Sequence, residues 1–209
     1  MRSYKILSLL SLAAVAGVAN ADLINVNSTG VGFADGAVDS NWLIDGGTAK
    51  VSAANGAWTG GNAVLATGAK WINIDGDPNA VRPAGVNLFS TTFDLTGYDA
   101  STANLGVFWS SDNGSKLYLN GHYIDALPGG TDPTRSYQVN KSVNISSYFV
   151  SGVNTLSFEV TNGDDEIPTP GPIGLIADIH GTVNAVPEPT SMAALGLGGL
   201  ALLRRRRKA

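Results

Sequence analysis

Apolar and polar residues alternate with a period of two through most of the second half of the chain. Within 89–95, Phe89 and Phe93 fall on one side of an extended backbone, whereas Ser90 and Asp94 fall on the other. This period is typical of β-strands with one buried face. The same alternation recurs at 105–109, 116–119, 143–145, 156–160 and 174–183.

Turn residues separate these alternating stretches. Asn120-Gly121 is the strongest two-residue hairpin signal in the chain, because a type I′ turn needs positive φ at both positions. Helical periodicity is weak throughout, and the first half is less regular. The sequence therefore predicts an all-β sandwich of many short strands. Further strands are expected near 23–26, 42–44, 49–52 and 71–74.

The N-terminus has the three parts of a secretory signal peptide. Arg2 and Lys5 are its charged region, 6–18 is an apolar core, and Ala19-Asn20-Ala21 is a small-x-small cleavage site. We expect residues 1–21 to be removed by cleavage after Ala21.

The C-terminus also has three unlike parts. Pro187-Glu188-Pro189 favours an extended, accessible chain, and an apolar run at 192–203 follows. A simple membrane anchor needs roughly 20 apolar residues, so this run is expected to span the membrane as a transmembrane helix only if the bilayer thins or the arginines snorkel. A basic cluster then resists translocation and holds the end on the cytoplasmic side. The cluster comprises Arg204, Arg205, Arg206, Arg207 and Lys208.

This tail, 186–209, resembles the PEP-CTERM sorting signal of Gram-negative bacteria. The resemblance implies export through the inner membrane, membrane contact through the tail, and recognition by an exosortase-type membrane protease. It also implies a location in the cell envelope or extracellular matrix and an association with exopolysaccharide and biofilm.

Removing both ends changes the charge of the chain. Of the 13 basic residues, seven lie in the end segments, so six basic residues face 16 acidic ones between them, a net charge of −10. Nucleic acid is therefore not an expected partner, because binding phosphates requires a basic surface. The chain has no cysteine, which excludes disulfides and thiolate chemistry.

The predicted domain, 22–185, contains a second resemblance. Its part at 89–183 looks like a galactose-binding-like jelly roll, a β-sandwich common in carbohydrate-binding modules. The residues that carry the likeness are at 92–95, 111–114, 117–121, 152–156 and 174–175. The resemblance implies a jelly-roll β-sandwich, flanked here by the signal peptide and a short hydrophobic sorting helix.

Exposed aromatic side chains are the candidates for binding sugars, since sugar rings stack on them. Trp58 lies in a glycine-rich stretch, 55–62, and is predicted to be an exposed platform. The alternative is a loop that folds back over the sandwich. Tyr118 and Tyr123 are expected to face away from the core side of the hairpin.

Catalytic and metal-binding signals are weak. The chain lacks a Gly-x-Ser-x-Gly elbow, a His-Glu-x-x-His helix and a phosphate loop. His180 shares a strand face with Asp178, but this pair alone does not make a catalytic site. Asp75, Asp77 and Asn79 place oxygen atoms at alternate positions as calcium loops do, although a simple turn is the favoured interpretation. No cofactor is required, and calcium is compatible with this sequence.

These features predict an exported, non-enzymatic protein that binds or structures exopolysaccharide or other biofilm glycans. A carboxylate-dependent glycan hydrolase or lyase is the alternative. A scaffold without a small ligand is a third possibility.

Overall fold

The computed structural model describes residues 21–53, 56–59, 63–129, 136–163, 169–186 and 196. The cleavage-site residue Ala19 lies outside these residues, as do Pro187, Glu188, Pro189 and the arginines Arg204, Arg205, Arg206 and Arg207. No helix among the described residues has the length and apolarity needed to cross a membrane.

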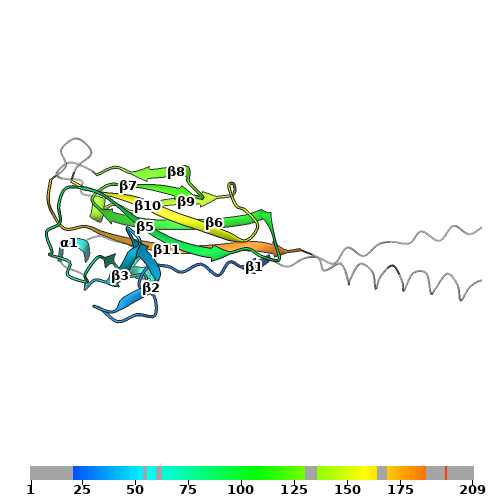
Figure 1. Ribbon diagram of the computed structural model, residues 1–209, viewed down its shortest axis with the longest axis horizontal. Helices are drawn as coiled ribbons and strands as arrows, with labels where there is room; N and C mark the ends of the chain where they lie inside the picture. The colour runs from blue at the N-terminus through cyan, green and yellow to red at the C-terminus, as the bar shows by residue number, and fades with distance from the viewer. Residues whose placement is uncertain are drawn as a thin grey trace, which may run out of the picture.

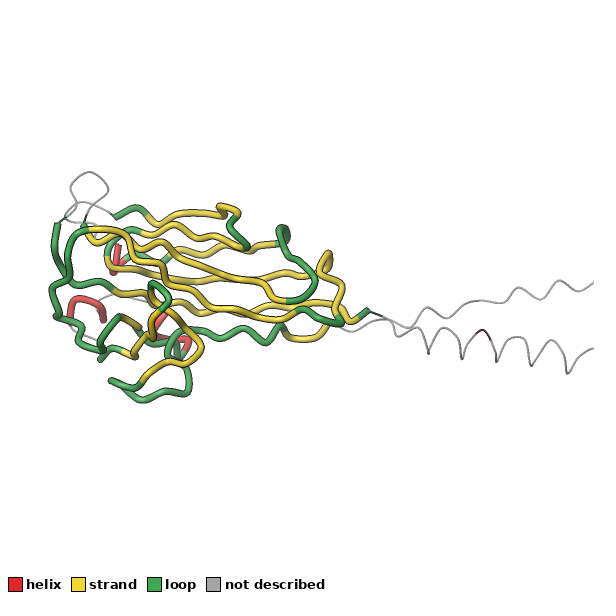
Figure 2. Tube along the Cα trace, in the orientation of Figure 1, coloured by secondary structure: helices red, strands yellow, loops and turns green. Residues whose placement is uncertain are grey.

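Eleven strands and three short helical turns make up the described structure (Figures 1 and 2). The helical turns are α1 (Gly56–Thr59), η1 (Ala63–Thr67) and η2 (Ser136–Gln138). The strands are β1 (Ala21–Leu23), β2 (Val38–Ile44), β3 (Gly47–Val51), β4 (Ile72–Asn73), β5 (Gly85–Asp94), β6 (Tyr98–Asp112), β7 (Ser115–Leu119), β8 (His122–Leu127), β9 (Lys141–Ile145), β10 (Val153–Asn162) and β11 (Gly174–Ala185).

Hydrogen bonds join ten of these strands in the order β8-β7-β10-β5-β2-β3-β4-β11-β6-β9, while β1 pairs with β11. The path folds over on itself, so that the β8-β7-β10-β5 layer packs against the β11-β6-β9 layer. The ring of Trp109 on β6 lies 5.9 Å from that of Phe158 on β10, across the space between the layers. From β5 onward the chain passes between the layers at every connection except β7–β8. This winding is that of a jelly roll, so the predicted all-β jelly-roll sandwich is confirmed.

The core follows the alternation seen in the sequence. On β5, Phe89 and Phe93 are buried, whereas Thr92 and Asp94 are exposed. The Asn120-Gly121 turn has φ values of 51° and 79°, as a type I′ hairpin requires. All four tryptophans are buried, with Trp42, Trp71 and Trp109 at 0% exposure and Trp58 at 1%.

A second, smaller core lies outside the sandwich. It consists of residues that pack against the outer surface of β11 and β6, and we call it the tryptophan cluster. Its buried members are Trp58, Val64, Ala69, Trp71, Tyr137 and Ile176. Ile176 points outward from β11 between Leu175 and Ala177, which belong to the main core. Residues 56–59 and 63–71 therefore cover part of one outer face of the sandwich.

The turn at Gly152, where the chain enters β10, has a structural role. Asn154 is fully buried, and both polar atoms of its side chain form hydrogen bonds. Its Oδ1 accepts from Asn120 Nδ2 at 2.8 Å and from Val150 N at 2.9 Å, and its Nδ2 donates to Val150 O and Gly152 O. The turn thus joins the start of β10 to the β7–β8 hairpin.

Candidate functional site

Tyr118 and Tyr123 lie together on the outer face of the β8-β7-β10-β5 layer. They are partners in the register of β7 and β8, and their ring centroids are 5.9 Å apart with an interplanar angle of 74°. Leu117 and Leu119, the neighbours of Tyr118, are fully buried, whereas Tyr123 is 56% exposed. The predicted outward orientation is confirmed, and a role in binding stays a prediction.

A carboxylate orients one of these rings. Tyr118 donates its hydroxyl hydrogen to Glu159 Oε2, on β10, at 2.9 Å. This hydrogen bond raises the pKa of Tyr118 above its ordinary value, and partial burial and the charge of Glu159 add to the effect. The Tyr118 hydroxyl is therefore protonated at neutral pH, and its ring is held in place beside that of Tyr123.

Small hydroxyl side chains continue this surface across the layer. Tyr118 is opposite Ser157 on β10, and Ser157 is in turn opposite Ser90 on β5. On the same face, Thr155 is opposite Thr92. The side chains of these two serines and two threonines are small. The surface beside the two tyrosines is therefore low and rich in hydrogen-bonding groups. We call Tyr118, Tyr123, Ser157, Ser90 and Glu159 the tyrosine patch.

Trp58 does not form an exposed platform, and the prediction that it does is wrong. Its side chain is 1% exposed and stacks on Trp71, with ring centroids 4.5 Å apart. Its Nε1 donates to Asp112 Oδ2 at 2.8 Å. The alternative interpretation, a segment folded back over the sandwich, is the observed one, because the cluster around Trp71 gives the ring an apolar environment.

A depression of about 300 Å³ does lie beside Trp58, with Asp112 and Asn162 in its lining. Asn162 is fully buried, and its Nδ2 donates to the backbone oxygens of Arg82, Pro83 and Gly171. Because Trp58 is almost completely covered, its ring offers no free face on which a sugar could stack.

The acidic stretch at 75–79 forms a turn. Asp75 Oδ1 accepts from Asp77 N at 3.1 Å, and Asp77 Oδ1 accepts from Asn79 N at 2.9 Å. The guanidinium of Arg82 also pairs with the Asp75 carboxylate. Among the described residues there is no group of three His, Cys, Asp or Glu side chains that could hold a metal ion.

Calcium binding at Asp75, Asp77 and Asn79 stays a prediction. If these residues held calcium, the melting temperature would rise when calcium is added and fall in a chelator. An unchanged melting temperature would show that these residues form a turn without binding calcium.

The alternation correctly placed Asp178 and His180 together. His180 Nε2 lies 2.6 Å from Asp178 Oδ2, and Ser28 Oγ donates to Asp178 Oδ1 at 3.1 Å. The Asp178 side chain is 8% exposed and that of His180 is 72% exposed. The carboxylate thus orients an imidazole on the outer face of the β11-β6-β9 layer. Sequence reasoning missed the hollow beside this pair, which is lined also by Gly106, Phe108, Ser142 and Asn144. The one signal in the sequence was a glycine inside a strand.

Residues 185–208 match the PEP-CTERM protein-sorting motif, so the predicted sorting signal is confirmed. This motif indicates export to the cell envelope or the extracellular space. No curated protein matches the chain by sequence.

Among solved structures, the chain is similar to three family 35 carbohydrate-binding modules. The one from Clostridium thermocellum is 11% identical, with 71% of this chain and 98% of that chain covered and a TM-score of 0.37. The module from an environmental isolate is 13% identical, with 79% and 98% covered and a TM-score of 0.32. The Paenibacillus barcinonensis module is 15% identical, with 66% and 93% covered and a TM-score of 0.31. Likenesses this distant carry no argument about function.

Proposed function

We propose that this chain is an exported, non-enzymatic protein that binds glycans through the tyrosine patch, and that its ligand is an exopolysaccharide of the biofilm matrix. The sorting motif at 185–208 supports the export, and we infer processing by an exosortase-type protease. The observation that supports glycan binding is the outward-facing pair of Tyr118, which is half-buried, and Tyr123, which is exposed, beside Glu159 and a row of serine hydroxyls.

The chemistry of the patch suits a polysaccharide chain. Tyrosine rings offer apolar faces to the C–H groups of a sugar, while Ser157 and Ser90 can hydrogen-bond with its hydroxyls. The row Tyr123–Tyr118–Ser157–Ser90 crosses four strands, a distance of about 15 Å between its ends. A surface of this length suits several consecutive sugar units rather than a single one.

The test is retention of the protein on immobilised exopolysaccharide from a bacterium that possesses the sorting system. Replacing Tyr123 by Ala should reduce the affinity at least about tenfold, because the ring contributes a large part of the contact area. Tyr148→Ala is the matched control, since Tyr148 is 49% exposed and its ring stacks on His122 outside the patch.

Equal retention of the wild-type protein and the Tyr123→Ala variant would refute the tyrosine patch as the binding site. A reducing-sugar assay on the same material addresses the alternative function. Release of new reducing ends by the wild-type protein would favour a glycan hydrolase, and the proposal expects none.

A further inference from the structure

A glycine in the middle of the longest strand leaves a hollow on the other outer face. Gly106 lies in β6, where Leu105 and Val107 on either side of it point into the core. Glycine inside a strand costs stability and often marks a position where a ligand comes close to the backbone. Its neighbours across the sheet are Asn144 on β9 and His180 on β11.

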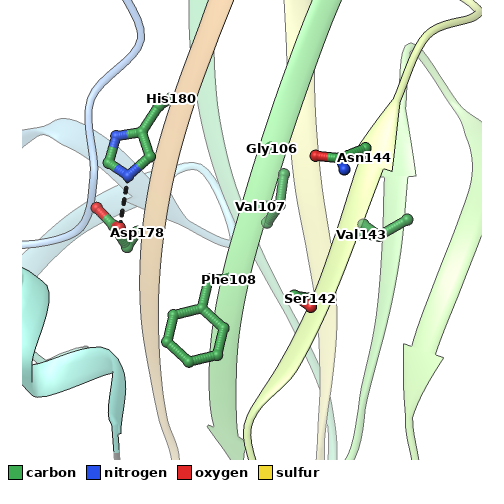
Figure 3. Close-up of a pocket in the computed structure, with 8 residues that line it drawn as sticks. All are labelled: Gly106, Val107, Phe108, Ser142, Val143, Asn144, Asp178 and His180. Carbon is green, nitrogen blue, oxygen red and sulfur yellow. Dashed lines mark hydrogen bonds and ion pairs between the residues drawn. The ribbon is translucent and has the colours of Figure 1, made fainter.

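The hollow above Gly106 has a volume of about 330 Å³, which is at the lower end of the range for ligand sites. Figure 3 shows Asp178 and His180 coming from β11, Phe108 from β6, and Ser142 and Asn144 from β9. Asn144 and His180 lie on opposite sides of Gly106, so their strands are about 10 Å apart. A single six-membered sugar ring with its hydroxyls fits this width.

The lining combines one aromatic ring with several polar groups. Phe108 is half-buried, next to Ser142 and Asp178 in the sheet register. The side chains of Ser142 and Asn144 have no hydrogen-bond partner among the described residues. Asp178 holds the imidazole of His180 through a 2.6 Å contact. The polar groups on the β11 side of the hollow are therefore oriented before a ligand arrives.

The charge of the lining restricts the ligand. Asp178 is an acidic group, and neither lysine nor arginine lines the hollow. An anionic sugar would therefore find no lysine or arginine with which to pair, and the one histidine of the lining already contacts Asp178. We propose that this hollow is a binding site for one neutral hexopyranose residue, separate from the tyrosine patch on the opposite layer.

The test follows the backbone amides of the purified protein by ¹⁵N NMR while methyl glycosides of glucose, galactose and mannose are added, in both anomers. At least one glycoside should shift the amide signals of Gly106, Asn144 and His180. Gly106→Val should abolish these shifts, because a Cβ at this position would lie only 3.3 Å from Asn144 Oδ1, and the side chain would block the middle of the hollow between Asn144 and His180.

The control is Asn104→Val, which makes a β-branched side chain on the same strand and the same face, outside the hollow. It should leave the shifts unchanged. Valine favours strands, so both variants should keep the fold, which the remaining amide signals report. If Gly106→Val does not fold, Asn144→Ala and His180→Ala are the substitutes, and each should weaken the glycoside affinity at least about fivefold.

The proposal is wrong if none of the six glycosides shifts these amides, or if Gly106→Val leaves the shifts intact. Its failure is distinguishable from failure of the tyrosine patch. Tyr123→Ala should not alter shifts at Gly106, and Gly106→Val should not alter retention that depends on Tyr123.

Discussion

The outer faces of the two layers differ in what lies over them. On the β8-β7-β10-β5 layer, Tyr123 is 56% exposed and Leu88 is 43% exposed, so this face is open. On the β11-β6-β9 layer, the tryptophan cluster covers Ile176 at one end of the face, and Ser28 contacts Asp178 farther along. Between these two covered parts, a hollow remains above Gly106.

This difference shows that contacts distant in sequence decide whether an aromatic residue can bind a ligand. Trp58 lies among glycines and polar residues, yet Trp71 and Asp112 bury it completely. Tyr123 follows a hairpin turn, and its ring stays exposed because β8 is an edge strand of the open face. The covered face thus uses its aromatics for stability, and we infer that the open face uses its aromatics for binding.

The largest effect expected from this comparison is on stability. Trp58→Ala should lower the free energy of unfolding by about 3–5 kcal/mol, because it removes a large buried ring and leaves a cavity against Trp71. Tyr123→Ala should change it by no more than about 0.5 kcal/mol. Urea denaturation of both variants measures the difference. Similar values for the two would show that the tryptophan cluster is not a second core.

A smaller effect is expected where β11 meets that cluster. Gly174→Ala would place a Cβ 2.8 Å from Cη2 of Trp58, and overpacking of this kind costs about 1–3 kcal/mol. Gly56→Ala is the matched control, since a Cβ at Gly56 meets nothing within 4 Å. Urea denaturation should show a loss only for Gly174→Ala. An equal result for both would mean that Trp58 moves aside freely.

The sequence predicted those parts of the fold that depend on local pattern. The period of two identified the buried faces of β5 and β10, because alternation and side-chain direction are directly linked. The Asn120-Gly121 turn set the pairing of Tyr118 with Tyr123, since a two-residue loop fixes the register of a hairpin. The same alternation placed Asp178 and His180 on one face.

What the sequence could not predict depends on pairing between distant segments. Trp58 donates to Asp112, 54 positions away in the chain, and no local pattern indicates that contact. The hollow above Gly106 exists only because β9 and β11 place Asn144 and His180 beside it. A glycine within a strand was the one available signal, but it does not reveal what surrounds the empty space.

The smallest expected effect concerns the ionisation of Tyr118 on the open face. Its pKa is raised, chiefly by the hydrogen bond to Glu159, so the folded protein holds this proton more strongly than the unfolded chain does. The resulting contribution to stability is complete below the ordinary tyrosine pKa of about 10. It is lost as the pH rises through the higher value of the folded state.

Tyr118→Phe should therefore flatten the alkaline fall of the unfolding free energy relative to the wild-type protein. Glu159→Gln should act in the same direction as Tyr118→Phe, because it removes the charge that disfavours the phenolate. Spectroscopic titration of the phenolate absorbance, together with urea denaturation at each pH, measures both quantities. If Tyr118 ionised at the same pH in the wild-type and Glu159→Gln proteins, its hydroxyl would not be held by Glu159. It would then be free to contact a ligand, and Tyr118 as well as Tyr123 would supply a polar group to the open face.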